Sequence, residues 1–162
     1  MPKKIQIDKV PSIVGTLYPS PFDGPCRARE RRKIGDAAGL TQYGVNMLTL
    51  PPGAWSSQRH WHTESDEFIC VIKGEVTLVT DEGAEVLGVG DAAGFKAGDT
   101  NGHCLQNRTE EAVLVPEIGT RRESDAAYYP DIDLVAPPGG QPAIYTQRDG
   151  TPYTDISRRG PE

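Results

Sequence analysis

Long apolar runs, cysteine and histidine are all scarce in this chain of 162 residues. No run approaches the roughly 20 apolar residues that a membrane span needs, and no apolar signal core follows Lys3 and Lys4. The three cysteines, Cys26, Cys70 and Cys104, are odd in number and irregularly spaced, which argues against a disulfide framework. We therefore expect a cytoplasmic protein with free thiols and no membrane partner.

Positive charge is also limited. The formal net charge is −6, which disfavours nucleic acids and anionic membranes as partners, because both require clustered positive charge. One segment is an exception, and its five basic residues are Arg27, Arg29, Arg31, Arg32 and Lys33. Two interpretations of this segment stay open: an anion-binding or gating segment at the mouth of a pocket, or a solvated loop that keeps the protein soluble.

Turn-forming residues, by contrast, are abundant. The chain has 18 glycines and 14 prolines and only 36% apolar residues, a composition that indicates short strands joined by tight turns. β-Prone segments bounded by glycine or proline turns predict strands at 45–50, 60–62, 67–73, 75–80, 84–87, 92–95, 103–107 and 112–118. Short strands at this spacing, with no helical segment between them, predict an all-β antiparallel sandwich or barrel.

These strands divide the chain into three regions. We expect a single domain with an N-terminal arm at 1–42, a barrel core at 43–120 and a C-terminal extension at 121–162. The extension is expected to pack on the barrel and to be frayed at its end. Residues 35–39 superficially resemble a phosphate loop, but no predicted strand precedes them and their spacing misses the dinucleotide-binding pattern, so an ordinary loop is expected.

The three histidines stand where a metal site needs them. His60 and His62 would share one face of a strand, because alternate side chains of an extended strand point the same way. Glu67 follows this pair, and His103 comes from a later predicted strand. Three imidazoles and one carboxylate predict a site for a divalent cation.

The segments around these residues resemble the two sequence motifs of the cupin superfamily. The first motif contains, in order, Gly53, His60, His62, Glu67 and Gly74. The second motif contains Gly90, Gly98, His103 and Asn107. Three departures occur, namely one extra residue before the first histidine, a lysine at position 96 where proline is usual, and four residues rather than two before His103. All three lie in turns and leave the ligand types intact.

The whole chain also looks like a bacterial group of small single-domain cupins. This resemblance implies a double-stranded β-helix, or jelly-roll barrel, with extended N- and C-terminal arms. It further implies that four side chains on the inner face of the barrel bind the metal, namely His60, His62, Glu67 and His103.

Such a ligand set suits a divalent transition metal, namely Fe, Mn, Ni, Co or Zn, and does not suit Ca²⁺, which prefers oxygen ligands. Four protein ligands leave up to two octahedral positions for a small oxygen-rich metabolite. Two kinds of chemistry stay open: dioxygenase cleavage, and non-redox isomerase, epimerase or lyase chemistry. A non-enzymatic small-molecule or metal-binding regulatory module is the alternative, and a structural cupin without metal is a third reading.

No catalytic residue can be assigned from the sequence. Glu64 and Asp66 lie between the ligands, but such residues are more often solvated turn residues than general bases. Arg59 offers a contact for an anionic substrate, although strand alternation directs it away from the metal ligands. The same alternation turns Cys104 away from the site, so we do not expect it to be a ligand.

Two partners are expected. One is a small-molecule ligand or substrate, with an anionic one among the options. The other is a second copy of the chain, because the outward-facing positions Phe68, Cys70 and Ile72 are apolar and favour a homodimer.

Overall fold

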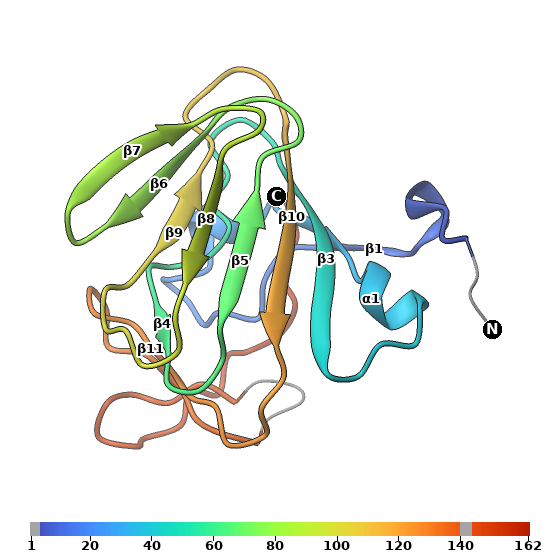
Figure 1. Cartoon of the computed structure of the whole chain (residues 1–162). Coiled ribbons are helices and arrows are strands. Elements are labelled where there is room, and N and C mark those ends of the chain that lie inside the picture. The colour runs from blue at the N-terminus through green and yellow to red at the C-terminus, as the bar shows by residue number, and fades with distance from the viewer. Residues whose placement is uncertain (1–3, 140–143) are drawn as a thin grey trace.

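The computed structural model describes residues 4–139 and 144–162 (Figure 1). Its strands are β1 (Ser12–Val14), β2 (Glu30–Arg32), β3 (Tyr43–Leu50), β4 (Trp61–His62), β5 (Glu67–Cys70), β6 (Val76–Thr80), β7 (Gly83–Leu87), β8 (Ala92–Phe95), β9 (Cys104–Gln106), β10 (Val113–Thr120), β11 (Ala127–Tyr128) and β12 (Val135–Ala136). One short helix, α1 (Ile34–Ala37), and two 3-10 turns, Ile7–Lys9 and Gly24–Cys26, complete the described elements. None of the helices in the described ranges is long and apolar enough to cross a membrane.

The strands form one large and two small antiparallel sheets. The large sheet has the order β1-β2-β3-β10-β5-β8, and the small ones have the orders β7-β6-β9 and β12-β11-β4. A single apolar core fills the space between the large sheet and the β7-β6-β9 sheet, with Leu48, Val71, Leu78 and Leu105 among its buried residues. The all-β barrel expected from the strand pattern is confirmed.

The interior of the barrel is apolar at one end and polar at the other. On β3 and β10 the inward-facing pairs Val113–Leu50 and Val115–Leu48 are fully buried and apolar. Further along the same strands the next inward pair is Glu117–Asn46. This polar end is the lower end in Figure 1, where β5 begins and β10 ends. The side chains predicted to bind metal therefore lie at the polar end of the barrel. Apolar side chains fill its opposite end.

The N-terminal region adds two strands to the barrel. β2 pairs with β3, and β1 pairs with β2, so residues expected only as an extended arm lengthen the large sheet. The prediction of a loop at 35–39 is wrong in part, because residues 34–37 form α1. Gly35 of this helix lies close to Val45 of β3. The close approach of the helix to the strand leaves room there only for a glycine.

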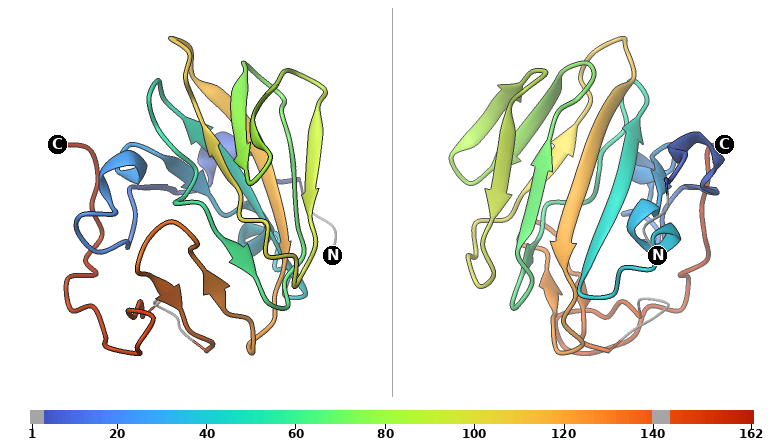
Figure 2. Two further views of the ribbon diagram at one scale, coloured as in Figure 1. Left: turned by 90° about the vertical axis from the view of Figure 1, so that its left-hand side faces the viewer. Right: turned by 45° about the vertical axis from the view of Figure 1, so that its right-hand side comes forward.

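The C-terminal region covers the polar end of the barrel. β11 pairs with β4, and a second apolar cluster joins both terminal regions, with Tyr18, Cys26, Tyr129, Leu134 and Tyr145 as buried members. Figure 2 shows the blue N-terminal and red C-terminal segments side by side. Thr16 and Arg159 exchange two backbone hydrogen bonds there, so the expected fraying of the end is not seen at Arg159. Residues 140–143, part of the predicted extension, lie outside the described residues.

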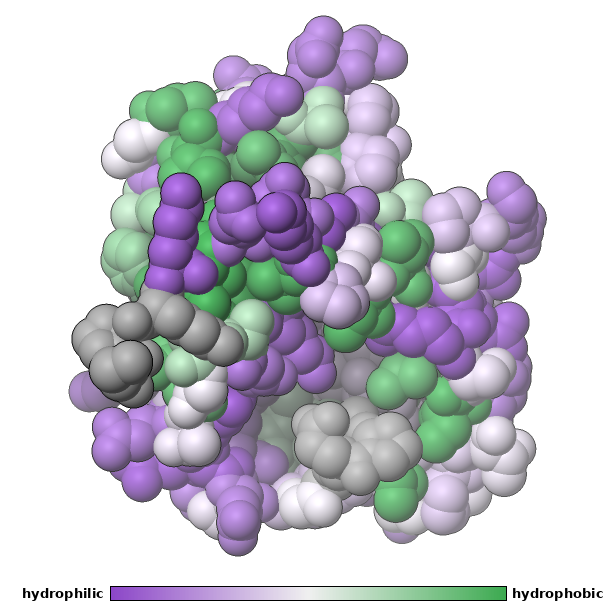
Figure 3. Space-filling view, turned by 90° about the vertical axis from the view of Figure 1, so that its right-hand side faces the viewer, coloured by the Kyte–Doolittle hydropathy of each residue, from purple (hydrophilic) through white to green (hydrophobic). Residues whose placement is uncertain are grey.

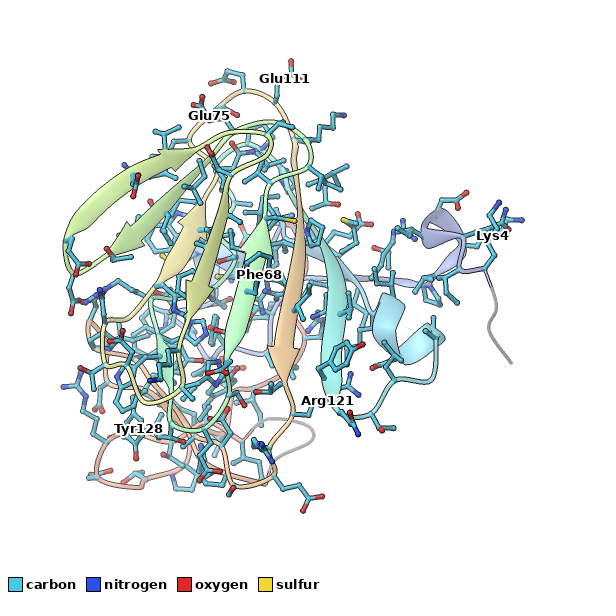
Figure 4. All side chains as sticks on the ribbon, in the orientation of Figure 1. Lys4, Phe68, Glu75, Glu111, Arg121 and Tyr128 are labelled. Carbon is cyan, nitrogen blue, oxygen red and sulfur yellow. The ribbon has the colours of Figure 1, made fainter. Side chains whose placement is uncertain are left out.

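The outer face of the large sheet carries exposed apolar side chains. Phe68, labelled in Figure 4, is 44% exposed and Ile72 is 47% exposed, as expected for an outward-facing set. The neighbouring face with α1 and the N-terminal segment mixes hydrophilic and hydrophobic side chains (Figure 3). The homodimer itself stays a prediction.

Candidate metal centre

Strand pairing brings the three histidines and Glu67 to one place. His60 and His103 lie directly opposite each other and exchange two backbone hydrogen bonds, of 3.1 and 2.9 Å. His62 lies two residues further along the same extended segment and turns to the same side. Glu67 is the first residue of β5 and faces the interior next to β8 and β10. The predicted strand at 60–62 thus presents both imidazoles to the same cavity.

The geometry centres on one carboxylate oxygen, Glu67 Oε2. The Nε2 atoms of His60, His62 and His103 lie 3.7, 3.6 and 2.9 Å from it, respectively. No described residue donates a hydrogen bond to this buried oxygen, since even the close His103 lacks the orientation of a hydrogen bond. Potential ligand atoms of His60, His62 and Glu67 all lie within 4.8 Å of one another. A buried anionic oxygen without a donor, facing three imidazole nitrogens, fits a bound cation.

Two of the imidazoles are fixed in the tautomer that metal binding requires. His60 Nδ1 lies 3.0 Å from the carbonyl oxygen of Gln58, and His62 Nδ1 lies 2.6 Å from Asp125 Oδ2. Neither acceptor has a proton to donate, so each Nδ1 is the donor, and in a neutral imidazole Nε2 then keeps its lone pair toward Glu67. Lone pairs directed at a carboxylate repel it unless a cation lies between them.

Aromatic rings hold the imidazoles in place. Phe95 stacks on His103 with ring centroids 3.5 Å apart, and Tyr129 stacks on His60 at 5.6 Å. Burial lowers the pKa of His60 to about 3, so this imidazole is neutral at pH 7. Burial alone would raise the pKa of Glu67, but contact with His103 and the other two imidazoles lowers it to about 2. A neutral imidazole beside an ionised carboxylate suits a divalent transition metal.

Asp125 contacts a candidate ligand, His62, and lies outside the sequence motifs. Besides holding His62, its carboxylate accepts hydrogen bonds from the backbone N–H groups of Glu64 at 2.8 Å and Ser65 at 3.2 Å. It thereby fixes the loop between the ligands from the C-terminal region. No local pattern marks this residue, because the contact depends on the pairing of β11 with β4 across more than 60 residues.

The other residues considered from the sequence lie elsewhere. Glu64 and Asp66 are exposed, and Asp66 accepts a hydrogen bond from the Ala97 backbone, as expected for turn residues. Arg59 points away from the ligands and forms an ion pair with Asp131 at 2.8 Å. Cys104 is buried and lies outside the group of potential ligand atoms.

Two adjoining cavities meet at the centre. The smaller, of about 180 Å³, lies between β4, β6 and β8, and the larger, of about 500 Å³, extends toward β2. His62, Glu67 and His103 line both. The larger cavity is also lined by Arg29, Arg31 and Lys33. The reading of this basic segment as a solvated loop is therefore wrong for Arg29, which is only 8% exposed, and for Arg31, whose side chain is largely buried.

Comparisons with known proteins agree with this architecture. The cupin domain family matches residues 46–118. The fold is similar to the crystal structure of a sugar phosphate isomerase of the cupin superfamily from Silicibacter pomeroyi, with 39% identity and a TM-score of 0.87 over 96% of this chain and 100% of that one. It is also similar to a candidate sugar phosphate isomerase from Acidithiobacillus ferrooxidans, at 25% identity and a TM-score of 0.69 over 75% of this chain and 77% of that one.

More distant relatives share the fold alone. The polyketide cyclase RemF from Streptomyces resistomycificus has 19% identity and a TM-score of 0.59 over 74% of this chain and 80% of that one. No curated protein sequence matches the chain. The matched domain and the 39% identity along a whole cupin structure show that this chain belongs to the cupin superfamily.

Proposed function

We propose that this chain is a metal-dependent enzyme that isomerises a sugar phosphate. The observation that carries the proposal is the larger cavity, which is lined both by the imidazole and carboxylate side chains of the candidate metal centre and by the basic side chains in and next to β2. A sugar phosphate has matching ends, a carbonyl with neighbouring hydroxyls and a phosphate. The similar structures from Silicibacter pomeroyi and Acidithiobacillus ferrooxidans carry the name of this activity.

Four residues would hold the metal: His60, His62 and Glu67, whose ligand atoms are grouped, and His103, whose Nε2 lies beside the same oxygen. When bound, a divalent metal supplies Lewis acidity toward two adjacent substrate oxygens, which promotes proton transfer between neighbouring carbons. Any of Fe, Mn, Ni, Co and Zn suits these donors. The ionised Glu67 neutralises part of the cation charge and leaves a net positive centre.

The surroundings of the ligands suit such a reaction. Phe95, Ile69 and Leu105 line the cavity and exclude water from its inner wall, while Asn46 and Ser57 offer polar groups to hydroxyls. A volume of about 500 Å³ lies within the range of small-molecule sites. Isomerisation is therefore favoured over dioxygenase chemistry by the names of the similar structures.

The test is an aldose–ketose interconversion assay on a panel of pentose and hexose phosphates. The protein is stripped with a chelator and reloaded with each of the five metals in turn. We expect interconversion that disappears on chelation and returns with at least one metal. Oxygen uptake by the Fe²⁺ form without interconversion would instead select a dioxygenase, and saturable binding without turnover under every metal would select a binding module.

A further inference from the structure

We propose that Arg29 and Arg31, with Lys33 at the rim, form the subsite that binds the phosphate group of the substrate. The proposal rests on the proposed function for the identity of the ligand, and on the cavity for its location. Three observations carry it: the alternation of side chains along β2, a buried guanidinium without a counterion, and the distance from the metal centre.

Side-chain alternation along β2 and its two flanking residues separates the basic side chains into two faces. Arg29, Arg31 and Lys33 line the larger cavity, whereas Glu30 and Arg32 do not. β2 pairs with β3 so that Arg31 lies beside Leu48, an inward-facing core residue. The three cationic side chains therefore share the face that looks into the barrel, and Arg32 on the opposite face ion-pairs with Glu30 at 3.0 Å.

Arg29 is a buried cation without a counterion. Its guanidinium donates to the Gly15 carbonyl at 3.2 Å, to Thr16 Oγ1 at 3.1 Å and to the Ser56 carbonyl, all of which are uncharged. Across the described part of the chain, no carboxylate oxygen lies within 4.0 Å of it. Burying an unpaired charge is unfavourable, and three contacts leave further donors of the guanidinium unused. An anion bound in the cavity supplies the missing charge.

Arg31 lies next to Arg29 and reinforces the positive charge. It donates to the same Ser56 carbonyl at 3.0 Å, so two guanidinium groups converge on one oxygen. Glu117 holds Arg31 through two hydrogen bonds of 2.7 and 2.8 Å, which orients the guanidinium and neutralises one of the two charges. The group keeps one net positive charge before Lys33 is counted. The Nη1 group of Arg31 takes part in none of these contacts and is left to donate to a phosphate oxygen.

The subsite lies at a suitable distance from the metal ligands. β2, β3, β10 and β5 are consecutive in the large sheet, so Arg31 and Glu67 stand three strand spacings apart. Arg31 pairs with Leu48 and so lies level with Val115 of β10, whereas Glu67 pairs with Gly119, four residues further along. At about 4.8 Å per spacing and about 3.3 Å per residue the two backbones are roughly 19 Å apart, and long side chains extend inward from both. The space left between a guanidinium and the carboxylate fits a sugar whose phosphate and carbonyl lie at opposite ends.

The test is calorimetric titration of the metal-free protein with inorganic phosphate, which removes binding to the metal itself. We expect saturable binding that Arg31→Gln weakens at least about tenfold, because a charge-assisted contact is lost. Arg32→Gln is the matched control, since it removes the same charge from the same strand on the opposite face, and it should leave the affinity within about twofold. Lys33→Gln, at an exposed position, should weaken phosphate binding about threefold. This variant replaces Arg31→Gln in the test if Arg31→Gln does not fold.

Absence of phosphate binding to the metal-free wild-type protein would overturn the proposal. Equal losses in Arg31→Gln and Arg32→Gln would also overturn it, because they would reveal only general electrostatic attraction. Arg31-dependent phosphate binding without sugar phosphate turnover would support the subsite while contradicting the proposed function. Turnover with an unchanged KM in Arg31→Gln or Lys33→Gln would refute the subsite and leave the function intact.

Discussion

Replacing Glu67 by glutamine is expected to lower the affinity for a divalent metal by more than about 100-fold, beyond the 10- to 100-fold typical of residues that only support a ligand. The carboxylate oxygen is the point on which the three Nε2 atoms converge. A glutamine keeps the size of the side chain but removes its charge, so the cation loses its only anionic ligand in this group. Interconversion of the sugar phosphate should be lost together with the metal.

Titration of chelator-stripped protein with Co²⁺, followed by its visible absorption, measures this affinity. Glu64→Gln is the matched control, because it makes the same change three residues away at an exposed position outside both cavities. We expect it to bind Co²⁺ like the wild type. Wild-type affinity in Glu67→Gln would show that the carboxylate is not a ligand.

Replacing Asp125 by alanine is expected to weaken metal binding by about 10- to 100-fold, although this side chain does not face the metal position. Its carboxylate fixes the tautomer of His62 through the 2.6 Å contact and holds two backbone N–H groups of the loop before Glu67. Without it, His62 is free to rotate and to carry its proton on Nε2. Asp125→Asn should lower the metal affinity less than Asp125→Ala does, because an amide oxygen can still accept the hydrogen bond from Nδ1.

Co²⁺ titration of the three proteins tests this order of affinities, with thermal unfolding to check that each variant is folded. Asp131→Ala serves as the control, because Asp131 lies in the same C-terminal region and forms an exposed ion pair with Arg59. It should leave metal affinity unchanged. Equal affinities in Asp125→Ala and wild type would mean that the aspartate supports the loop alone.

The grouping of the candidate ligands and the barrel strands could be predicted because their signals are local. Side-chain alternation places His60 and His62 on one face, and glycines mark the turns that separate the strands. Gly74 and Gly98, which close parts of the two motifs, both have a φ of +78°, a conformation that favours glycine. Such local sequence patterns, taken together, are sufficient to predict a β-barrel and a group of candidate ligands.

The contributions of the terminal regions could not be predicted, because they depend on pairing between distant segments. The alternation of Arg29, Arg31 and Lys33 is visible in the sequence, but only the pairing of β2 with β3 decides which face of β2 lies inside the barrel. Asp125 likewise reaches His62 only after β11 has joined β4. The 34–37 helix also follows from packing, since Gly35 lies against β3. Local patterns identify the metal centre, and tertiary pairing determines what surrounds it.

The most direct test of the metal centre is the elemental content of the wild-type protein purified without chelators and without a metal-binding tag. We predict one divalent transition-metal ion per chain, removed by dialysis against a chelator and restored by adding back the same metal. Protein that contains no such metal, and that takes up none of Fe, Mn, Ni, Co or Zn on titration, would contradict the account.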